Sequence, residues 1–320
     1  MQKVDFDQLI FDIKQVLAND LRSTFGVVGH TPVAYDLIAF FRAVGSENRL
    51  LGVYSDEADQ VENRTLHRPM WQLVADAPDA VIIASDQDKE RLLELALPSL
   101  RAHTRVILAG YEHFAFRDPI FTETVGTALV PSLANGYPNT LVHLYQCLQN
   151  AARLKLSGVV AEFGMFKGGT TMLLSRFIDR LGQSWPVIGF DTFAGFPPKR
   201  SVLDMYCHPD CVFPDENLVR RHVSERNIEV VTGDLVTTAS RLANADIILA
   251  FMDTDNFTSA SAVLDVIQDR VVTGGAIVFD HFTGRNRFRY TLGERFAAKR
   301  LLADQRYFNL HDTGVFLRQR

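Results

Sequence analysis

Cysteine is scarce in this chain: Cys147, Cys207 and Cys211 are the only three among 320 residues. They are too few, and odd in number, for the disulfide framework of a small secreted protein, so we expect a reducing, cytoplasmic environment. No apolar run approaches the ~20 residues of a membrane span, and the acidic N-terminal segment MQKVDFDQLIFD is unlike a signal peptide. The net charge of −5 excludes a sequence-wide basic field. We therefore expect neither membrane nor nucleic-acid partners.

Residues 1–125 alternate short apolar segments with amphipathic ones. A helical apolar pattern over residues 1–22 precedes four short apolar segments, and helical segments lie between these. The apolar segments are FGVV before the turn Gly29-His30-Thr31-Pro32, then LLGVYS (50–55), AVIIAS (80–85) and RVILAG (105–110). This pattern predicts a small Rossmann-like α/β domain with a parallel sheet.

The first turn of this domain offers a weak binding signal. It contains Gly26 and Gly29, and Asp56 follows the second strand, where nucleotide-binding folds often place a ribose-binding acid. Because the glycine fingerprint is incomplete, a role in assembly or in positioning the acceptor of a neighbouring site is at least as well supported. Residues 126–157 are expected to form a linker and a lead-in helix.

Residues 158–320 continue the strand–helix rhythm and end in a tight hairpin. Strands are expected at 158–162, 187–190, 228–231, 247–253 and 275–280, followed by 307–312 and 314–319 around Thr313. This order matches the seven-stranded sheet of class I S-adenosylmethionine methyltransferases, in which the last strand turns back antiparallel. The fold class is therefore predicted to be α/β, with this sheet and the smaller N-terminal domain.

The segment GVVAEFGMFKGGTT, from Gly158 to Thr171, is the feature around which the second domain is organised. An apolar strand ends at Glu162, three glycines follow, and a helix begins. Glycine lets the backbone approach a ligand closely, and a helix start offers free N–H groups. The spacing is not the G-x-G-x-x-G of dinucleotide binders, so NAD is not the expected cofactor. The residues assigned to cofactor binding here are Gly164, Gly168, Gly169 and Thr170.

Acidic residues fall at the ends of five successive strands, and these ends form the ligand crevice of an open α/β sheet. One such residue is usually a helix cap or turn former, but five in register indicate a polar, partly cationic ligand. We expect Glu162 to face its amino group, Asp191 its ribose hydroxyls and Asp234 its adenine. The five acids are Glu162, Asp191, Asp234, Asp253 and Asp280. The first four are assigned to the cofactor site together with Thr192, Phe193 and Gly233.

Five motifs together resemble the macrocin O-methyltransferase family, class I methyltransferases of antibiotic and sugar-modifying pathways. They are EFGMFKGGTT, GFDTFAGFP (189–197), GDL (233–235), MDTDNFTSA (252–260) and GGAIVFDHF (274–282), and the similarity covers about residues 135–320. The resemblance implies transfer of a methyl group from S-adenosylmethionine to a hydroxyl of a sugar or other small biosynthetic intermediate. It also implies a homo-oligomer and a divalent metal, usually Mg²⁺, near the methyl donor.

The resemblance places the metal ligands at Asp253, Asp280 and His281, and the general base at Asp255. Carboxylate oxygens suit a hard cation, and a bound metal would lower the pKa of the acceptor hydroxyl. His281 stands where the family often has a second acid, and imidazole suits Mn²⁺, Fe²⁺ or Zn²⁺ better than Mg²⁺. A metal-free reaction with His281 as the catalytic base is therefore the alternative.

A basic segment, RNRFRYTLGERFAAKR (285–300), follows the last of these motifs. A solvated basic helix would explain most of it. Arg285, Arg287 and Arg289 nevertheless precede the helix and are expected beside the acceptor, where guanidinium groups bind phosphate or carboxylate. This favours a phosphate-bearing acceptor such as a nucleotide-linked sugar, with Tyr137 as a further acceptor contact. The pair Gly293-Glu294 also resembles a short family motif, but the sequence gives it no role.

Residues 199–223 are long for a connection between strands and are predicted to form a lid. The run from Cys207 to Cys211 lacks the second Cys/His cluster that a zinc site needs. Two other functions fit part of the sequence. A nicotinamide-dependent nucleotide-sugar-modifying enzyme would need a full glycine fingerprint at Gly29, and a non-catalytic S-adenosylmethionine-binding protein would lack the acids around Asp253.

Overall fold

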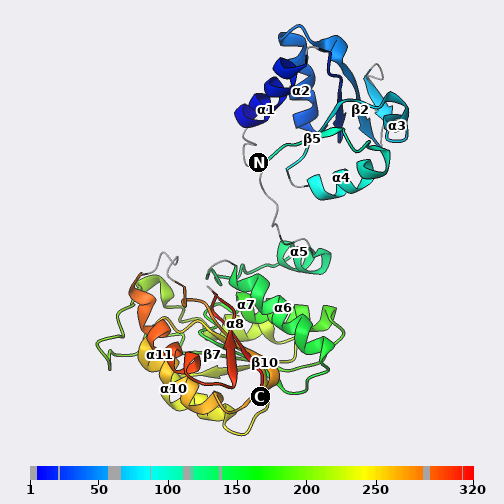
Figure 1. Cartoon of the computed structure of the whole chain (residues 1–320). Helices are drawn as coiled ribbons and strands as arrows, with labels where there is room; N and C mark the ends of the chain where they lie inside the picture. The colour runs from blue at the N-terminus through cyan, green and yellow to red at the C-terminus, as the bar shows by residue number, and fades with distance from the viewer. Residues whose placement is uncertain are drawn as a thin grey trace. The chain divides into compact units, whose positions relative to one another are not determined.

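The structure is a computed structural model of the chain and describes residues 6–20, 22–56, 66–86, 88–110, 116, 118–136, 139–283, 289–311 and 313–320. The chain divides into two compact units, residues 1–115 and 116–320, which are treated separately (Figure 1). This boundary precedes helix α5 (Pro119–Gly126), whereas the sequence pattern predicts a first domain that extends to residue 125. None of the helices in the described residues combines the length and apolar character needed to cross a membrane.

The first unit is built on a five-stranded parallel sheet in the order β3-β2-β1-β4-β5, which confirms the expected Rossmann-like arrangement. Its short edge strand β3 was not expected, because a His-Arg-Pro segment has no apolar run. The strands are β1 (Phe25–Val28), β2 (Leu50–Ser55), β3 (His67–Pro69), β4 (Ala80–Ile83) and β5 (Arg105–Leu108).

Helices cover both faces of this sheet, with a separate apolar core under each pair (Figure 1). Side chains alternate between the faces of a strand. In β4, Ala80 and Ile82 therefore pack with α1 and α2, whereas Val81 and Ile83 pack with α3 and α4. The helices are α1 (Phe6–Asn19), α2 (Pro32–Ala43), α3 (Gln72–Asp76) and α4 (Lys89–Ala96).

The second unit contains a seven-stranded sheet in the order β11-β12-β10-β9-β6-β7-β8. β12 is antiparallel to both β10 and β11, whereas the other neighbouring strands are parallel, as the sequence predicted. The strands are β6 (Val159–Phe163), β7 (Val187–Asp191), β8 (Ile228–Thr232), β9 (Ile247–Met252), β10 (Val271–Phe279), β11 (Tyr307–Asn309) and β12 (Val315–Arg318).

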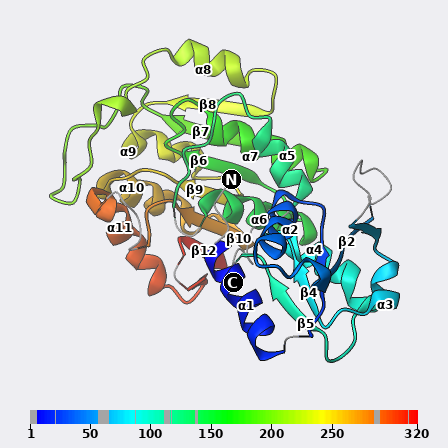
Figure 2. The same cartoon turned by 90° about the horizontal axis from the view of Figure 1, so that it is seen from above.

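Two helical layers enclose this sheet (Figure 2). α5, α6 and α7 pack on one face, and α9, α10 and α11 pack on the other. The chain runs from β6 outward to β7 and β8 and then returns to β9 on the other side of β6, so the crevice between β6 and β9 is the switch point where such sheets bind ligands. The helices are α6 (Thr140–Arg153), α7 (Gly169–Arg180), α8 (Glu216–Val223), α9 (Leu235–Thr238), α10 (Phe257–Ile267) and α11 (Leu292–Leu302).

Replacing Phe177 by Ala should lower the free energy of unfolding of the second unit by about 3–5 kcal/mol, because a fully buried ring is lost. The ring of Phe177 stacks on Phe121 at 5.5 Å and meets Tyr145 at 4.8 Å between centroids. Urea unfolding would measure the change. Phe308→Ala, at a half-exposed position on β11, is the control and should change stability by less than about 0.5 kcal/mol. Equal effects would contradict this account of the core.

Candidate active site

A cavity of about 570 Å³ lies at the carboxyl ends of β6, β7 and β9. Its wall combines the glycine loop after β6, the ends of these strands, and parts of segments 130–135 and 195–211. Because the carboxyl ends of these parallel strands meet at one edge of the sheet, most of the site residues expected from the sequence lie together. Those that line the cavity are Glu162, Gly164, Gly169, Thr170, Asp191, Thr192, Asp253, Asp255 and His281.

Five expected site residues are not among the described residues that line this cavity, namely Gly168, Phe193, Gly233, Asp234 and Asp280. Asp234 caps α9 by accepting a hydrogen bond from the N–H of Val236 at 3.0 Å, and it pairs with Arg200 at 2.6 Å. Its position at a strand end is thus explained by a helix cap. The next residue, Leu235, does line the cavity.

The residues expected to contact the acceptor lie outside the described residues: they are Tyr137, Arg285, Arg287 and the side chain of Arg289. Their roles stay predictions.

Glu162 ends β6 and is only 2% exposed. Burial, together with the nearby charges of Asp191 and Asp280, raises the pKa of its carboxyl to about 8, although a hydrogen bond donated by Thr171 opposes the shift. The carboxyl is therefore protonated at neutral pH unless a cation faces it. Such a group favours a ligand that brings positive charge into the cavity.

Backbone N–H groups hold both carboxylate oxygens of Asp191 at the end of β7. The N–H of Phe166 donates to one oxygen at 2.8 Å, and the N–H of Phe193 donates to the other at 2.7 Å. Both phenylalanines have positive φ, 48° and 55°, a conformation that these bonds help to maintain. Burial raises the pKa of Asp191, and the bonds oppose the shift. The carboxylate is thereby fixed on the cavity wall with lone pairs left for ligand hydroxyls.

Two glycines of the loop after β6 are required by close backbone packing. A Cβ on Gly164, where φ is +99°, would lie 2.1 Å from the carbonyl oxygen of Asp253. A Cβ on Gly169 would lie 2.2 Å from the carbonyl oxygen of Pro131. Segment 130–136 was interpreted as a connection, yet it forms part of the cavity wall and packs on the start of α7.

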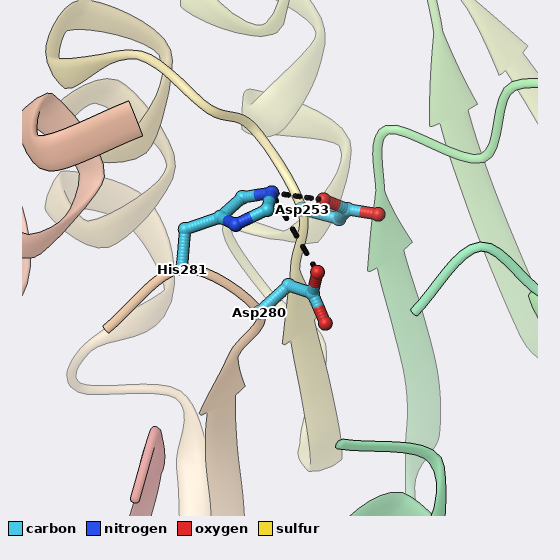
Figure 3. A group of neighbouring side chains, drawn as sticks. All are labelled: Asp253, Asp280 and His281. Carbon is cyan, nitrogen blue, oxygen red and sulfur yellow. Dashed lines mark ion pairs between the residues drawn. The ribbon is translucent and has the colours of Figure 1, made fainter. Parts of the chain in front are cut away.

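Asp253, Asp280 and His281 form a compact group beside the cavity (Figure 3). The Nε2 atom of His281 lies 3.4 Å from Oδ1 of Asp253 and 3.6 Å from Oδ2 of Asp280. One ligand atom from each residue lies within 4.8 Å of the other two. Octahedral ligands at about 2.1 Å from Mg²⁺ are about 3–4 Å apart, so the spacing fits a divalent cation. Two carboxylates and one imidazole also suit Mn²⁺. No other such group occurs within the described ranges, which include Cys207 and Cys211.

The group concentrates negative charge in a buried place. Burial raises the pKa of both Asp253 and Asp280, and the charge of Asp280 raises that of Asp253 further. Burial alone would lower the pKa of His281, but hydrogen bonds to Asp253 and Asp255 outweigh it and raise that pKa to about 12. His281 Nε2 lies 2.9 Å from Oδ1 of Asp255. Without a metal, the imidazolium provides positive charge beside these carboxylates; as a metal ligand, His281 would be neutral and the metal would supply that charge.

Glu294, on α11, positions the loops after β9 and β10, a role that the sequence alone did not indicate. Its fully buried carboxylate accepts hydrogen bonds from the N–H groups of Thr254 at 2.8 Å, Asp255 at 3.0 Å and His281 at 3.1 Å. One side chain thus joins the loops after β9 and β10 that carry the acidic group. It also holds Asp255 in its positive-φ conformation, 59°, which is unfavourable by about 1–3 kcal/mol for a residue other than glycine.

Asp280 is oriented by the segment that precedes α6. Its carboxylate accepts hydrogen bonds from the N–H of Asn135 at 3.0 Å and of Gly136 at 2.9 Å. A Cβ on Gly136 would lie 2.1 Å from the carbonyl oxygen of Asp280, so only glycine allows this approach. Sequence reasoning missed both residues because no periodic pattern connects them to β10.

Glu294→Ala should lower the free energy of unfolding by at least about 1–3 kcal/mol, because it leaves three buried N–H groups without an acceptor. Glu294→Gln should cost less, since its amide oxygen still accepts from one side. Urea denaturation measures both changes. The matched control is Glu225→Ala, at an exposed site, which should be close to neutral. If Glu294→Ala were as neutral as this control, the carboxylate would not hold the two loops.

Comparison with known proteins gives the family. Residues 137–319 match the family model described as macrocin-O-methyltransferase (TylF). No curated protein sequence matches the chain. Among solved structures, the O-methyltransferase NovP is 20% identical with a TM-score of 0.47, covering 56% of this chain and 78% of its own. The calicheamicin methyltransferase CalS11 is 20% identical with a TM-score of 0.46, covering 78% of this chain and 89% of its own. The Podospora anserina methyltransferase PaMTH1 is 11% identical with a TM-score of 0.37, covering 66% and 99%.

The assignment rests on the family model, which spans more than half of the chain. The matched residues include the glycine loop, the acids at the strand ends and Glu294. The chain therefore belongs to the macrocin-O-methyltransferase family and is an S-adenosylmethionine-dependent O-methyltransferase.

Proposed function

We propose that the cavity binds S-adenosylmethionine between Glu162 and Asp191, and that a metal-assisted step with Asp255 as general base methylates a hydroxyl of a sugar or other natural-product intermediate. The observation that carries this proposal is the meeting of these carboxylates and the Asp253–Asp280–His281 group at one cavity. The family supports the type of acceptor.

Glu162 and Asp191 would bind two different parts of the donor, the methionine part and the ribose. The carboxylate of Glu162 would face the ammonium group of the methionine part, because a cation there offsets the burial that raises its pKa. Asp191 would accept hydrogen bonds from the ribose hydroxyls. Gly164, Gly169 and Thr170 would line the path of the chain between them, and Leu235 would contact the adenine in place of its neighbour Asp234.

Asp253, Asp280 and His281 would hold a divalent metal, Mg²⁺ or Mn²⁺. When bound, the metal would lower the pKa of the acceptor hydroxyl and orient its oxygen. Asp255 lines the cavity beside His281 and would accept the hydroxyl proton. The new O–CH₃ bond forms as the S–CH₃ bond breaks, and the sulfur leaves as the neutral thioether of S-adenosylhomocysteine. In a metal-free reaction, His281 would be the base, but the raised pKa leaves it protonated and a poor acceptor.

The acceptor would lie under the segment from Gly195 to Cys211, which lines the cavity. Asn256 anchors this segment: its amide accepts from the N–H of Tyr206 at 3.0 Å and donates to the Tyr206 carbonyl at 2.9 Å. The segment is thereby tied to the loop that carries Asp253 and Asp255. A phosphate-bearing acceptor held by Arg285 and Arg287, a contact from Tyr137, and a homo-oligomeric assembly remain part of the proposal on sequence grounds.

Binding of S-adenosylhomocysteine should strengthen between pH 6 and 7.5. Below its pKa of about 8 the carboxyl of Glu162 is protonated, and the ligand ammonium favours the ionised form, so binding must expel a proton. Calorimetric titration in two buffers of different ionisation enthalpy should show net proton release at pH 7. Glu162→Gln should weaken binding about tenfold or more and reduce this release. Unchanged affinity and proton release in this variant would overturn the placement of the ammonium group.

One Mn²⁺ ion should bind per chain, as measured by electron paramagnetic resonance during titration. Asp253→Asn and Asp280→Asn should each remove this binding, whereas Asp265→Asn, an exposed aspartate of α10, should retain it. With an accepted substrate, chelator should stop turnover, and Asp255→Asn should lower kcat about 10²–10⁴-fold. Absence of bound Mn²⁺ together with full turnover in excess chelator would rule out the metal.

A further inference from the structure

The first unit has a cavity of its own, of about 120 Å³, at the carboxyl ends of β1 and β2. Residues 29–31 after β1, Ser55 and Asp56 at the end of β2, and one side of α4 form its wall. The chain runs from β1 to β2 and β3, then returns to β4 on the other side of β1. This cavity therefore lies at the switch point of the sheet, where open parallel sheets bind ligands.

Ser55 provides an independent sign of a ligand. The residue is 6% exposed and lines the cavity, yet its hydroxyl has no hydrogen-bond partner within the described part of the chain. A buried hydroxyl without a partner is unfavourable in a folded protein, and few such groups persist. A ligand hydroxyl in the cavity would satisfy it.

Charged side chains of both signs line the cavity, namely Asp56, Asp88 and Arg91. Asp56 is an exposed carboxylate at the end of β2, the position from which an acid binds ribose hydroxyls in nucleotide-binding folds. Arg91, on α4, is exposed and makes no hydrogen bond or ion pair with the described residues. Its guanidinium and the N–H of Val33 can bind a phosphate; Pro32 at the start of α2 has no N–H, and the N–H of Ala34 donates to Thr31. Met70 and Leu92 give the cavity an apolar wall.

We propose that this cavity binds a nucleoside 5′-monophosphate. The ribose hydroxyls would bind Ser55 and Asp56, the phosphate would bind Arg91 and the start of α2, and the base would lie against the apolar wall. This site is separate from the methyltransferase cavity, and the proposal does not depend on the roles assigned there.

The turn after β1 favours one phosphate over the pyrophosphate of a dinucleotide. Gly29, with φ of +105°, and Ala34, which is buried, occupy the first and third places of a G-x-G-x-x-G/A fingerprint. The second place is Thr31, whose hydroxyl donates to the carbonyl of Ala84 and accepts from the N–H of Ala34. The second glycine of that fingerprint lets the backbone approach the pyrophosphate. A fixed threonine followed by Pro32, which has no N–H, prevents this approach.

Calorimetry with the full chain tests the proposal. Saturating S-adenosylhomocysteine is present throughout, so that the methyltransferase cavity cannot bind the added nucleotide. AMP, GMP, CMP and UMP are titrated separately, with NAD⁺ and inorganic phosphate as comparisons. At least one monophosphate should bind one-to-one in the micromolar range, more tightly than either comparison ligand. Ser55→Ala, Asp56→Asn and Arg91→Gln should each weaken this binding about tenfold or more.

The variants are chosen so that loss of folding cannot imitate loss of the site. Asp56 and Arg91 are exposed, so their replacement should leave the first unit folded, and an unchanged urea unfolding transition of the full chain would report this. Arg105→Gln, another exposed arginine of the same unit, should bind the nucleotide normally. The proposal fails if no monophosphate binds, if phosphate alone binds equally well, if NAD⁺ binds more tightly, or if the Asp56 and Arg91 variants bind as the unchanged protein does.

Discussion

Buried negative charge is the constraint on which the second unit depends. Glu162 and Asp280 are each 2% exposed, and burial raises the pKa of both. Carboxylates in such surroundings are unfavourable unless positive charge faces them. His281 supplies one such charge within the protein. A methyl donor with ammonium and sulfonium groups brings further positive charge. The buried carboxylates that are unfavourable in the protein alone are therefore stabilised when such a ligand binds.

Backbone hydrogen bonds position the carboxylates of Asp191, Asp280 and Glu294. Asp191 accepts hydrogen bonds from two backbone N–H groups, and Asp280 accepts from two more. Glu294 likewise accepts from N–H groups of the loops that carry Asp255 and His281. Backbone donors lose little entropy on binding because the fold already holds them. These hydrogen bonds therefore hold the negatively charged carboxylates close together although they repel one another.

The sequence predicted the strands well and the acidic site in part, and the limits have physical reasons. Apolar runs ending in an acid marked β6, β7 and β9, because strand ends in a parallel sheet meet at one edge. A helix cap and a ligand-binding acid look alike in sequence, and the hydrogen bond from Val236 shows that Asp234 is a helix cap. Glu294 and Asn135 act on residues far away in the chain, which no local pattern reveals. The acceptor contacts Tyr137, Arg285 and Arg287 stay predictions.

The hydrogen bonds from Asn135 and Gly136 to Asp280 also define where a working methyltransferase fragment must begin. The family match starts at residue 137, one residue after these donors, and the Pro131 carbonyl that packs on Gly169 lies further upstream. A fragment cut at the family boundary would retain every acid of the cluster but lack the backbone that aims Asp280. A fragment meant to keep these contacts should therefore start before α5, at the boundary between the two compact units.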